Sequence, residues 1–306
     1  MLISEVIQKV KSYHCGYFKR NGEVITIDAK TTRDQILFGN PEVNCTGVVT
    51  TLWASIEVIE KAHDLNANLI ICHESLFWNH GDHTDWLKAE KNKTFLEKKA
   101  LLEKYGIVVW RNHDYVHSGI PVENGGFVDG IFYGLAKTLG WENYIDVATS
   151  QYIDTADGWD NFTSTGKLNP LAYVIPQTTL KELADFLIKQ LHLNGVKVIG
   201  DLSQKITKVA IPFHVFNDAR YAVNLANKKQ TDCFLTMEIV DFTLAEYVKD
   251  TNFTNDRIGI ISMGHFNIEE PGMRYMADYV FKLLNEDIKV TFVQAGDHYI
   301  YVPKAK

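Results

Sequence analysis

Continuous apolar segments alternate with segments of helical period along the first half of the chain. The alternation predicts strands at 47–51, 68–72 and 107–111 and amphipathic helices at 56–65, 92–105 and 127–139. Strands that are apolar at every position and are separated by helices are typical of parallel strands buried on both faces of a sheet. The pattern therefore predicts an α/β layer.

A second series of the same kind begins after residues 149–169, which hold Asp, Thr, Gly and Ser without apolar periodicity and are typical of a connection. In this series we expect strands at 171–175, 197–199, 208–211, 233–236, 257–261 and 289–293, and helices at 179–193, 218–226, 242–248 and 271–284. We therefore expect a first α/β lobe at residues 1–148, a connection at 149–170 and a second α/β lobe at 171–306. Two similar lobes favour a site in the cleft between them, at the carboxyl ends of strands.

Composition narrows the class of protein. The chain has 306 residues, of which 46% are hydrophobic and 23% charged, enough for one large or two medium cores. A formal net charge of −7 argues against a nucleic-acid partner. The first residues have a helical period rather than the apolar core of a signal peptide, and no apolar run approaches the roughly 18 residues of a membrane span. The cysteines have no C-x-x-C spacing, which favours reduced thiols in a cytoplasm.

Residue types that bind metals cluster where three predicted strands end. The clusters are His73 and Glu74, then His113, Asp114 and His117, and finally His265 and Glu269. Imidazole and carboxylate are ligands that Zn²⁺, Mn²⁺ and Fe²⁺ accept. Because adjacent side chains of a strand point to opposite faces, His73 and Glu74 reach one site only if the chain bends there. Three such ends, if they converge, form one polynuclear metal site.

Other residues near these ends suit substrate handling. The guanidinium of Arg111 suits an anionic group of a small-molecule substrate. His113, Asp114 and Glu238 suit proton transfer, as does His214. Each also has a structural reading, in which His113 and Asp114 bond each other in a loop and Glu238 is an acid at a helix start. The pattern alone leaves both readings open. The P-loop, dinucleotide-binding and serine-hydrolase motifs are missing from the sequence.

These segments, in this order, resemble the NIF-three-like dinuclear metal-centre family, also called type two GTP cyclohydrolase homologues. The resemblance runs from about Val48 to Val302. It rests on Ile56 to Trp78, similar to a helix, strand and His-His-Pro-Leu-Phe-Phe segment; Ile107 to Trp141, similar to a strand and His-Thr-x-x-Asp loop; Lys208 to Ala210; Asp232 to Glu238; and Gly264 to Glu269, similar to a Gly-His-x-x-x-Glu segment.

The resemblance implies five ligands for two divalent metal ions. The family's late pair is intact as His265 and Glu269, and its first His is His73. Its second His falls on Glu74 and its Asp on His117, so imidazole and carboxylate are exchanged between two positions while the number of each is kept. Further departures indicate a divergent branch: Ser75 replaces Pro, Met237 replaces Gly and Trp53 replaces Asp.

The expected function is metal-dependent hydrolysis. Two divalent ions, Zn, Mn or Fe, would share a bridging hydroxide that attacks a small anionic substrate. The resemblance implies that the target is a C–N bond of a nucleotide-like ring, although the same metal centre could also hydrolyse a phosphoester. It further implies a homo-oligomer, namely a ring-shaped hexamer. The first alternative is a metal-binding, metal-trafficking or regulatory protein that acts through its oligomer. The second is a structural α/β scaffold that binds no stoichiometric metal.

Overall fold

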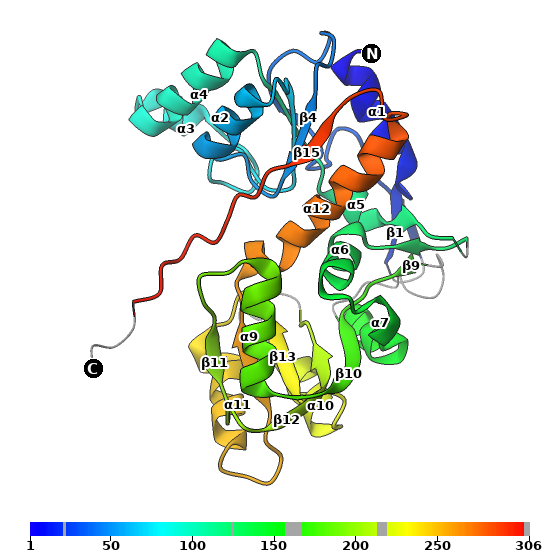
Figure 1. Ribbon diagram of the computed structural model, residues 1–306, viewed down its shortest axis with the longest axis vertical. Coiled ribbons are helices and arrows are strands. Elements are labelled where there is room, and N and C mark those ends of the chain that lie inside the picture. Colours follow the sequence, from blue (N-terminus) through cyan, green and yellow to red (C-terminus); the bar gives the residue numbers. More distant parts are fainter. Residues whose placement is uncertain (21–22, 124, 157–166, 213–218, 303–306) are drawn as a thin grey trace. The chain divides into compact units, whose positions relative to one another are not determined.

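The computed structural model describes residues 1–20, 23–123, 125–156, 167–212 and 219–302 (Figure 1). The chain forms two compact units whose segments interleave along the sequence. Unit 1 comprises Met1–Phe18, Val24–Gly134 and Gly272–Ala295, and unit 2 comprises Lys19–Glu23, Leu135–Pro271 and Gly296–Lys306. Each unit is described by itself below.

Unit 1 is built on a mixed sheet with the strand order β15-β4-β5-β6-β3. These strands are β15 (Val290–Phe292), β4 (Val48–Thr51), β5 (Leu69–Cys72), β6 (Val108–Arg111) and β3 (Ile36–Phe38). β15, β4, β5 and β6 run parallel, and β3 is antiparallel to β6. Every residue of β4, β5 and β6 is buried, as the apolar pattern predicts for strands covered on both faces.

Helices cover both faces of this sheet. Val49, Ile70 and Val109, which are in register, join one core cluster with residues of α2 (Ile56–Asp64) and α4 (Lys93–Tyr105). The next residue of β4, Thr50, points to the other face and donates from Oγ1 to the carbonyl of Met273 over 2.8 Å. Met273 belongs to α12 (His265–Leu283), whose residues from Gly272 onward lie in unit 1.

Unit 2 has a similar sheet, with the order β10-β12-β13-β14-β11. These strands are β10 (Ala172–Thr179), β12 (Lys205–Ala210), β13 (Cys233–Thr236), β14 (Gly259–Ser262) and β11 (Lys197–Ile199). β12, β13 and β14 are parallel, whereas β10 and β11 are antiparallel edge strands. The buried face of α9 (Leu180–Leu191) packs on β10 and β12. The prediction of two similar α/β lobes is thus confirmed.

The remaining elements are short or lie near the unit boundaries. They are α1 (Ile3–Tyr13), β1 (Tyr17–Arg20), β2 (Glu23–Thr26), α3 (Asp85–Ala89), α5 (Asp114–Ser118), β7 (Ile120–Pro121), β8 (Phe127–Val128), α6 (Gly130–Leu139), η1 (Glu142–Tyr144), α7 (Val147–Ala156), β9 (Lys167–Leu168), α10 (Arg220–Asn227), η2 (Asp241–Ala245) and α11 (Glu246–Thr251). All four cysteines are free. Among the described residues, no helix is both long and apolar enough to cross a membrane.

Three elements differ from the sequence-based expectation. The strand expected at 289–293 in the second lobe pairs in parallel with β4 and completes the sheet of unit 1, because a parallel partner is selected by long-range packing rather than by neighbours in sequence. The expected connection at 149–170 contains most of helix α7. The helix expected from Pro271 begins six residues earlier, at His265, and carries Pro271 inside it.

Gly272 is required where α12 meets α6, within unit 1. A Cβ at this position would lie 2.5 Å from Cα of Ile131 and 2.9 Å from its carbonyl oxygen. We expect Gly272→Ala to lower the free energy of unfolding by about 1–3 kcal/mol, because backbone atoms cannot yield as a side chain can. Denaturant unfolding measures this. Asp278→Ala, on an exposed position of the same helix, is the control, and equal stability of both variants would contradict the packing.

Candidate metal centre

The chain bends where β5 ends, which is the condition for His73 and Glu74 to serve one site. The backbone N–H groups of both residues donate to the same carbonyl, that of Leu52, over 3.0 and 2.9 Å. The strand alternation is therefore broken at this point. A ligand atom of Glu74 lies within 4.8 Å of one of His73. Both side chains are buried, at 0% and 8% exposure.

The residues that follow, 73–82, form a loop that we call the ligand loop. Arg111, 1% exposed, donates from Nε to the carbonyl of His73 (2.9 Å) and from Nη1 to that of His80 (2.8 Å). Its Nη2 donates to Oε2 of Glu74 over 3.2 Å, and Asp82 lies 3.6 Å from Nη1. The guanidinium expected to bind substrate is thus engaged inside the protein, where it fixes the ligand loop.

A second buried cation supports the same loop. Lys98 donates from Nζ to the carbonyl of Leu76 over 2.7 Å, and burial lowers the pKa of its ammonium to about 8. On the other side of the chain, Oδ1 of Asp82 accepts from the backbone N–H of Leu76 over 2.8 Å. Asp82 is therefore a structural residue of the ligand loop.

Helix α5 is fixed by a buried acid from a distant part of the sequence. Oδ1 of Asp34 accepts from the backbone N–H groups of His113 (2.5 Å) and Asp114 (2.9 Å), and Oδ2 accepts from that of Tyr115 (2.7 Å). These are N–H groups at the start of the helix, which have no acceptor inside it. Burial raises the pKa of Asp34 to about 6, against the effect of these bonds, so the carboxyl is ionised at neutral pH.

The side chain of Asp114 in turn accepts hydrogen bonds from residues next to Asp34. Its Oδ2 accepts from Oγ1 of Thr32 (2.8 Å) and from the backbone N–H of Arg33 (3.0 Å). Its Oδ1 lies 3.0 Å from Nδ1 of His113. Although burial favours the neutral acid, these bonds hold the pKa of Asp114 well below its usual range. The structure thus favours the reading in which His113 and Asp114 bond each other.

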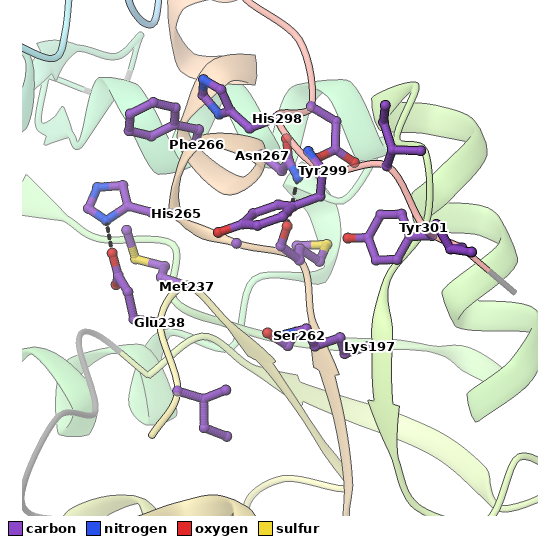
Figure 2. Close-up of a pocket in the computed structure, with 16 residues that line it drawn as sticks. Lys197, Met237, Glu238, Ser262, His265, Phe266, Asn267, His298, Tyr299 and Tyr301 are labelled. Atoms are coloured by element: carbon purple, nitrogen blue, oxygen red, sulfur yellow. Dashed lines mark hydrogen bonds and ion pairs between the residues drawn. The ribbon is translucent and has the colours of Figure 1, made fainter. Parts of the chain in front are cut away.

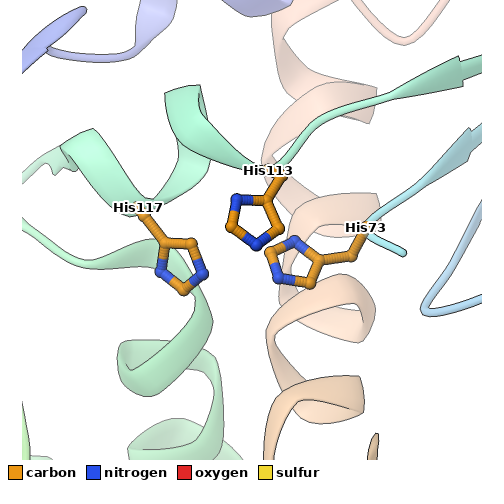
Figure 3. Close-up of side chains that lie close together, drawn as sticks. All are labelled: His73, His113 and His117. Atoms are coloured by element: carbon orange, nitrogen blue, oxygen red, sulfur yellow. The ribbon is translucent and has the colours of Figure 1, made fainter. Parts of the chain in front are cut away.

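Three imidazoles from two strand ends converge in unit 1 (Figure 3). Nδ1 of His73 lies 3.1 Å from the carbonyl of Asn112, and Nδ1 of His117 lies 2.9 Å from Oδ2 of Asp129. Carbonyl and carboxylate oxygens only accept, so each Nδ1 carries the proton and each Nε2 carries the lone pair. With Asp114 doing the same for His113, all three rings have the orientation typical of metal-bound histidine.

The geometry of this three-His cluster (His73, His113 and His117) fits a metal ion. One ligand atom from each residue lies within 4.8 Å of the others, and the ring centroids are 4.6 to 5.0 Å apart. Burial, followed by repulsion from His73, lowers the pKa of His113 well below its usual value. A neutral imidazole offers the lone pair that a metal requires, so the donor set suits Zn²⁺ or a related first-row ion.

A second cluster lies in unit 2, at the ends of β13 and β14, and we call it the acid–His set. Nδ1 of His265 lies 2.5 Å from Oε1 of Glu238 (Figure 2), and its Nε2 lies 2.9 Å from Oε2 of Glu269. Burial opposes a charge on this ring, but the carboxylates of Glu269 and Glu238 outweigh burial and raise the pKa of His265 to about 11. In this state Nε2 carries a proton and faces the carboxylate of Glu269, at the position where an ion would bind.

The structure thus brings the expected residues together in two sets, one in each unit. Of the five expected ligands, Glu74 pairs with Arg111 and the rest belong to the three-His cluster or the acid–His set. His113, expected as a proton carrier, is a member of the three-His cluster. Their joint use of one centre, in a cleft between the lobes, stays a prediction. His214 lies outside the described residues.

Sequence reasoning missed the oxygen acceptors behind the imidazoles. Asp129 left a local signal, because an acid directly before an apolar helix is typical of an N-cap, and its Oδ1 accepts from the N–H groups of Ile131 and Phe132. Asp34 left none, since it lies about 80 positions away from the helix that it caps.

Comparison with known proteins identifies a family for the chain. The model of the Duf34/NIF3 (NGG1p interacting factor 3) family matches residues 29–298. A Clostridium acetobutylicum protein named GTP cyclohydrolase 1 type 2 homolog is 24% identical over 242 residues, 79% of each chain. A protein of the same name from Clostridium perfringens is 22% identical over 270 residues, 87% of this chain and 90% of the other.

Solved structures share the fold at low sequence identity. A hypothetical protein from Staphylococcus aureus superposes with a TM-score of 0.66 at 20% identity, covering 99% of both chains. A Bacillus cereus protein related to NIF3 gives a TM-score of 0.64 at 17% identity, also over 99% of both chains. At these identities the likeness is evidence for the fold alone.

Removal of the Asp34 cap tests how the three-His cluster is positioned. We expect Asp34→Ala to lower the free energy of unfolding by about 1–3 kcal/mol, because three N–H groups at the helix start lose their acceptor. We also expect zinc affinity to fall by about 10-fold or more, as for other residues that orient metal ligands. Thermal unfolding and zinc titration measure the two effects. Asp85→Ala, at a fully exposed acid, should change neither, and unchanged zinc affinity in Asp34→Ala would contradict the role.

The two clusters should bind metal with different pH dependence. An ion at His265 displaces a proton, so its apparent affinity should rise by up to about tenfold per pH unit below the pKa of this ring. An ion at the three-His cluster should show little change between pH 7 and 9, because His113 is already neutral. Calorimetric titration with zinc in buffers of different ionisation enthalpy measures both. His265→Gln should abolish only the pH-dependent event, and two pH-independent events would contradict the assignment.

Proposed function

Because the chain belongs to the Duf34/NIF3 family, we propose that it is a metal-dependent hydrolase with a dinuclear centre of divalent ions. The observation that carries the proposal is the orientation of the three-His cluster, in which each Nδ1 is held by an oxygen acceptor. Each ring therefore keeps its proton on Nδ1 and the lone pair of Nε2 available to an ion. Zinc, manganese and iron all accept this donor set.

We assign the first ion to His73, His113 and His117, and the second to His265 and Glu269. Glu74 stands beside His73 and completes the expected ligand set. Three protein ligands leave an open coordination position, which a catalytic site requires and a closed structural site lacks.

When bound, the ions supply positive charge that polarises the bond under attack and makes water more acidic. The chain's own residues set the remaining conditions. Asp114 and Asp129 keep the protons of His113 and His117 on Nδ1. Arg111 holds Glu74 in place and has its donors engaged in the protein. Glu238, whose side chain is 34% exposed, is the carboxylate of the acid–His set best placed to accept a proton from solvent or substrate.

The proposed substrate is a small anionic molecule with a hydrolysable C–N bond in a nucleotide-like ring. Its support is the name of two relatives, GTP cyclohydrolase 1 type 2 homolog. The divergent residues Glu74 and His117 favour a substrate that differs from that of the relatives.

Two further proposals concern assembly and location. The ring-shaped hexamer expected from the resemblance stays a prediction, which light scattering of the purified protein would test. Four free cysteines support a reducing compartment such as the cytoplasm.

Metal content and turnover of the same samples test the proposal. We expect about two divalent ions per chain by elemental mass spectrometry, and hydrolysis in a screen of ring and phosphoester substrates. His113→Ala should lose one ion and the activity, because the three-His cluster cannot close around an ion with two imidazoles. His83→Ala, at an exposed histidine of the ligand-loop region, is the matched control.

Two outcomes would count against the hydrolase. Two ions per chain without hydrolysis, but with rapid metal exchange, would favour a metal carrier. Fewer than about half an ion per chain, unchanged in His113→Ala, would overturn the metal centre. Glu238→Gln separates metal binding from proton transfer, since the variant should retain both ions and its turnover should fall by about 100-fold.

A further inference from the structure

Unit 2 contains a cavity of about 630 Å³ that the ligand assignments above leave without an occupant (Figure 2). It lies at the carboxyl ends of β13 and β14 and is closed on another side by residues 297–302 near the C-terminus. Glu238 and His265 of the acid–His set line it. Its size falls in the range of about 300–1,000 Å³ typical of small-molecule sites.

Aromatic side chains form much of the cavity wall. Phe266 and His298 contact each other with ring centroids 4.9 Å apart, and Tyr299 and Tyr301 line the same space from the C-terminal segment. In Figure 2 the Tyr299 ring lies across the middle of the cavity, between the acid–His set and Tyr301. Tyr299 is 65% exposed. Aromatic faces left accessible in a cavity favour a flat ring as the ligand, by stacking.

One positive charge in the wall is available to an anion. Its carboxylates are already engaged: Glu238 bonds His265, and Asp297 accepts from the backbone N–H groups of Asn194 (3.1 Å) and Tyr299 (3.0 Å). Lys197, on the edge strand β11, also lines the cavity, and no acid of the described residues forms an ion pair with it. Its ammonium is therefore the one lining cation without an acidic partner in that part of the chain.

The start of α12 adds to this preference. Residues 264–267, at the N-terminus of this 19-residue helix, line the cavity. Backbone N–H groups at a helix start attract negative charge. Lys197 and the helix start are independent features of the sequence, and both face the same space.

We propose that this cavity binds a planar aromatic or heteroaromatic ring that carries an anionic group, with Lys197 contacting the anion and Tyr299 stacking on the ring. The proposal rests on the proposed function, since it places such a substrate beside His265 and Glu238. In this proposal Lys197 is the cation that contacts the substrate, because Arg111 is engaged in the ligand loop.

Calorimetric titration with three probes tests the proposal. Adenosine 5′-monophosphate carries both the ring and the charge, adenosine carries the ring, and ribose 5-phosphate carries the charge. The full-length protein is titrated in chelator, so that no metal bridges the phosphate, and again after zinc loading. We expect the monophosphate to bind at least about tenfold more tightly than either half, because stacking and the charged contact each contribute.

Two substitutions separate the two contacts. Lys197→Met, which keeps an apolar stem, should lower the affinity for the monophosphate by about tenfold and leave the affinity for adenosine unchanged. Lys197→Arg should restore the affinity for the monophosphate. Tyr299→Leu should lower the affinity for both the monophosphate and adenosine and leave the affinity for ribose 5-phosphate unchanged. Lys205→Met and Phe253→Leu, at exposed positions of unit 2 outside the cavity, are the matched controls. Thermal unfolding verifies that each variant is folded.

The result that overturns the proposal is a monophosphate that binds no better than its halves, or whose binding is the same in Lys197→Met as in Lys205→Met. The proposal requires only a ring and a charge, so this probe is a sufficient test. Normal metal content with no ligand binding would overturn this inference and leave the metal centre intact. Ligand binding in a protein that takes up no metal would support the cavity and overturn the hydrolase.

Discussion

The hydrogen bonds of the buried Arg111 guanidinium are the interaction on which the candidate metal centre of unit 1 depends. A charge removed from water is costly unless it is paired and fully bonded. Arg111 meets this condition with the carbonyls of His73 and His80 and the carboxylate of Glu74. The parallel register that places Arg111 beside Cys72 brings the guanidinium to the end of β5. One cation therefore holds the chain after the bend and fixes how His73 and Glu74 are presented.

The same principle recurs around the imidazoles, where bonds to oxygen atoms determine which nitrogen faces a metal. Asp34 holds the start of α5 and so the position of His113 and His117. Asp129 begins α6 and also bonds His117, so one carboxylate orders a helix and a ligand together. In unit 2 the carboxylates act directly on His265, which carries a proton when no ion is bound. The two clusters thus offer a metal different charges: a neutral set and an acidic set.

The sequence predicted most of the regular elements, because apolar period and strand burial are local properties. It also located His73, His117 and His265 at strand ends, since the carboxyl ends of parallel strands meet at one edge of a sheet. It could not place β15, whose partner β4 lies more than 200 positions away, nor Asp34, whose role depends on the same kind of long-range contact. The start of α12 at His265 was missed because Pro271, inside the helix, imitates a helix boundary. Arg111 was expected to contact substrate because the sequence does not reveal that its side chain is buried.

In the proposed metal centre, His73, His113 and His117 coordinate one divalent ion through Nε2. Diffraction data from zinc-loaded crystals, collected on both sides of the zinc absorption edge, would show this coordination. We expect an anomalous peak about 2.0–2.1 Å from Nε2 of each of the three rings, with every Nδ1 still bonded to its oxygen acceptor. Zinc bound elsewhere while these rings coordinate nothing, or bound through Nδ1, would contradict it.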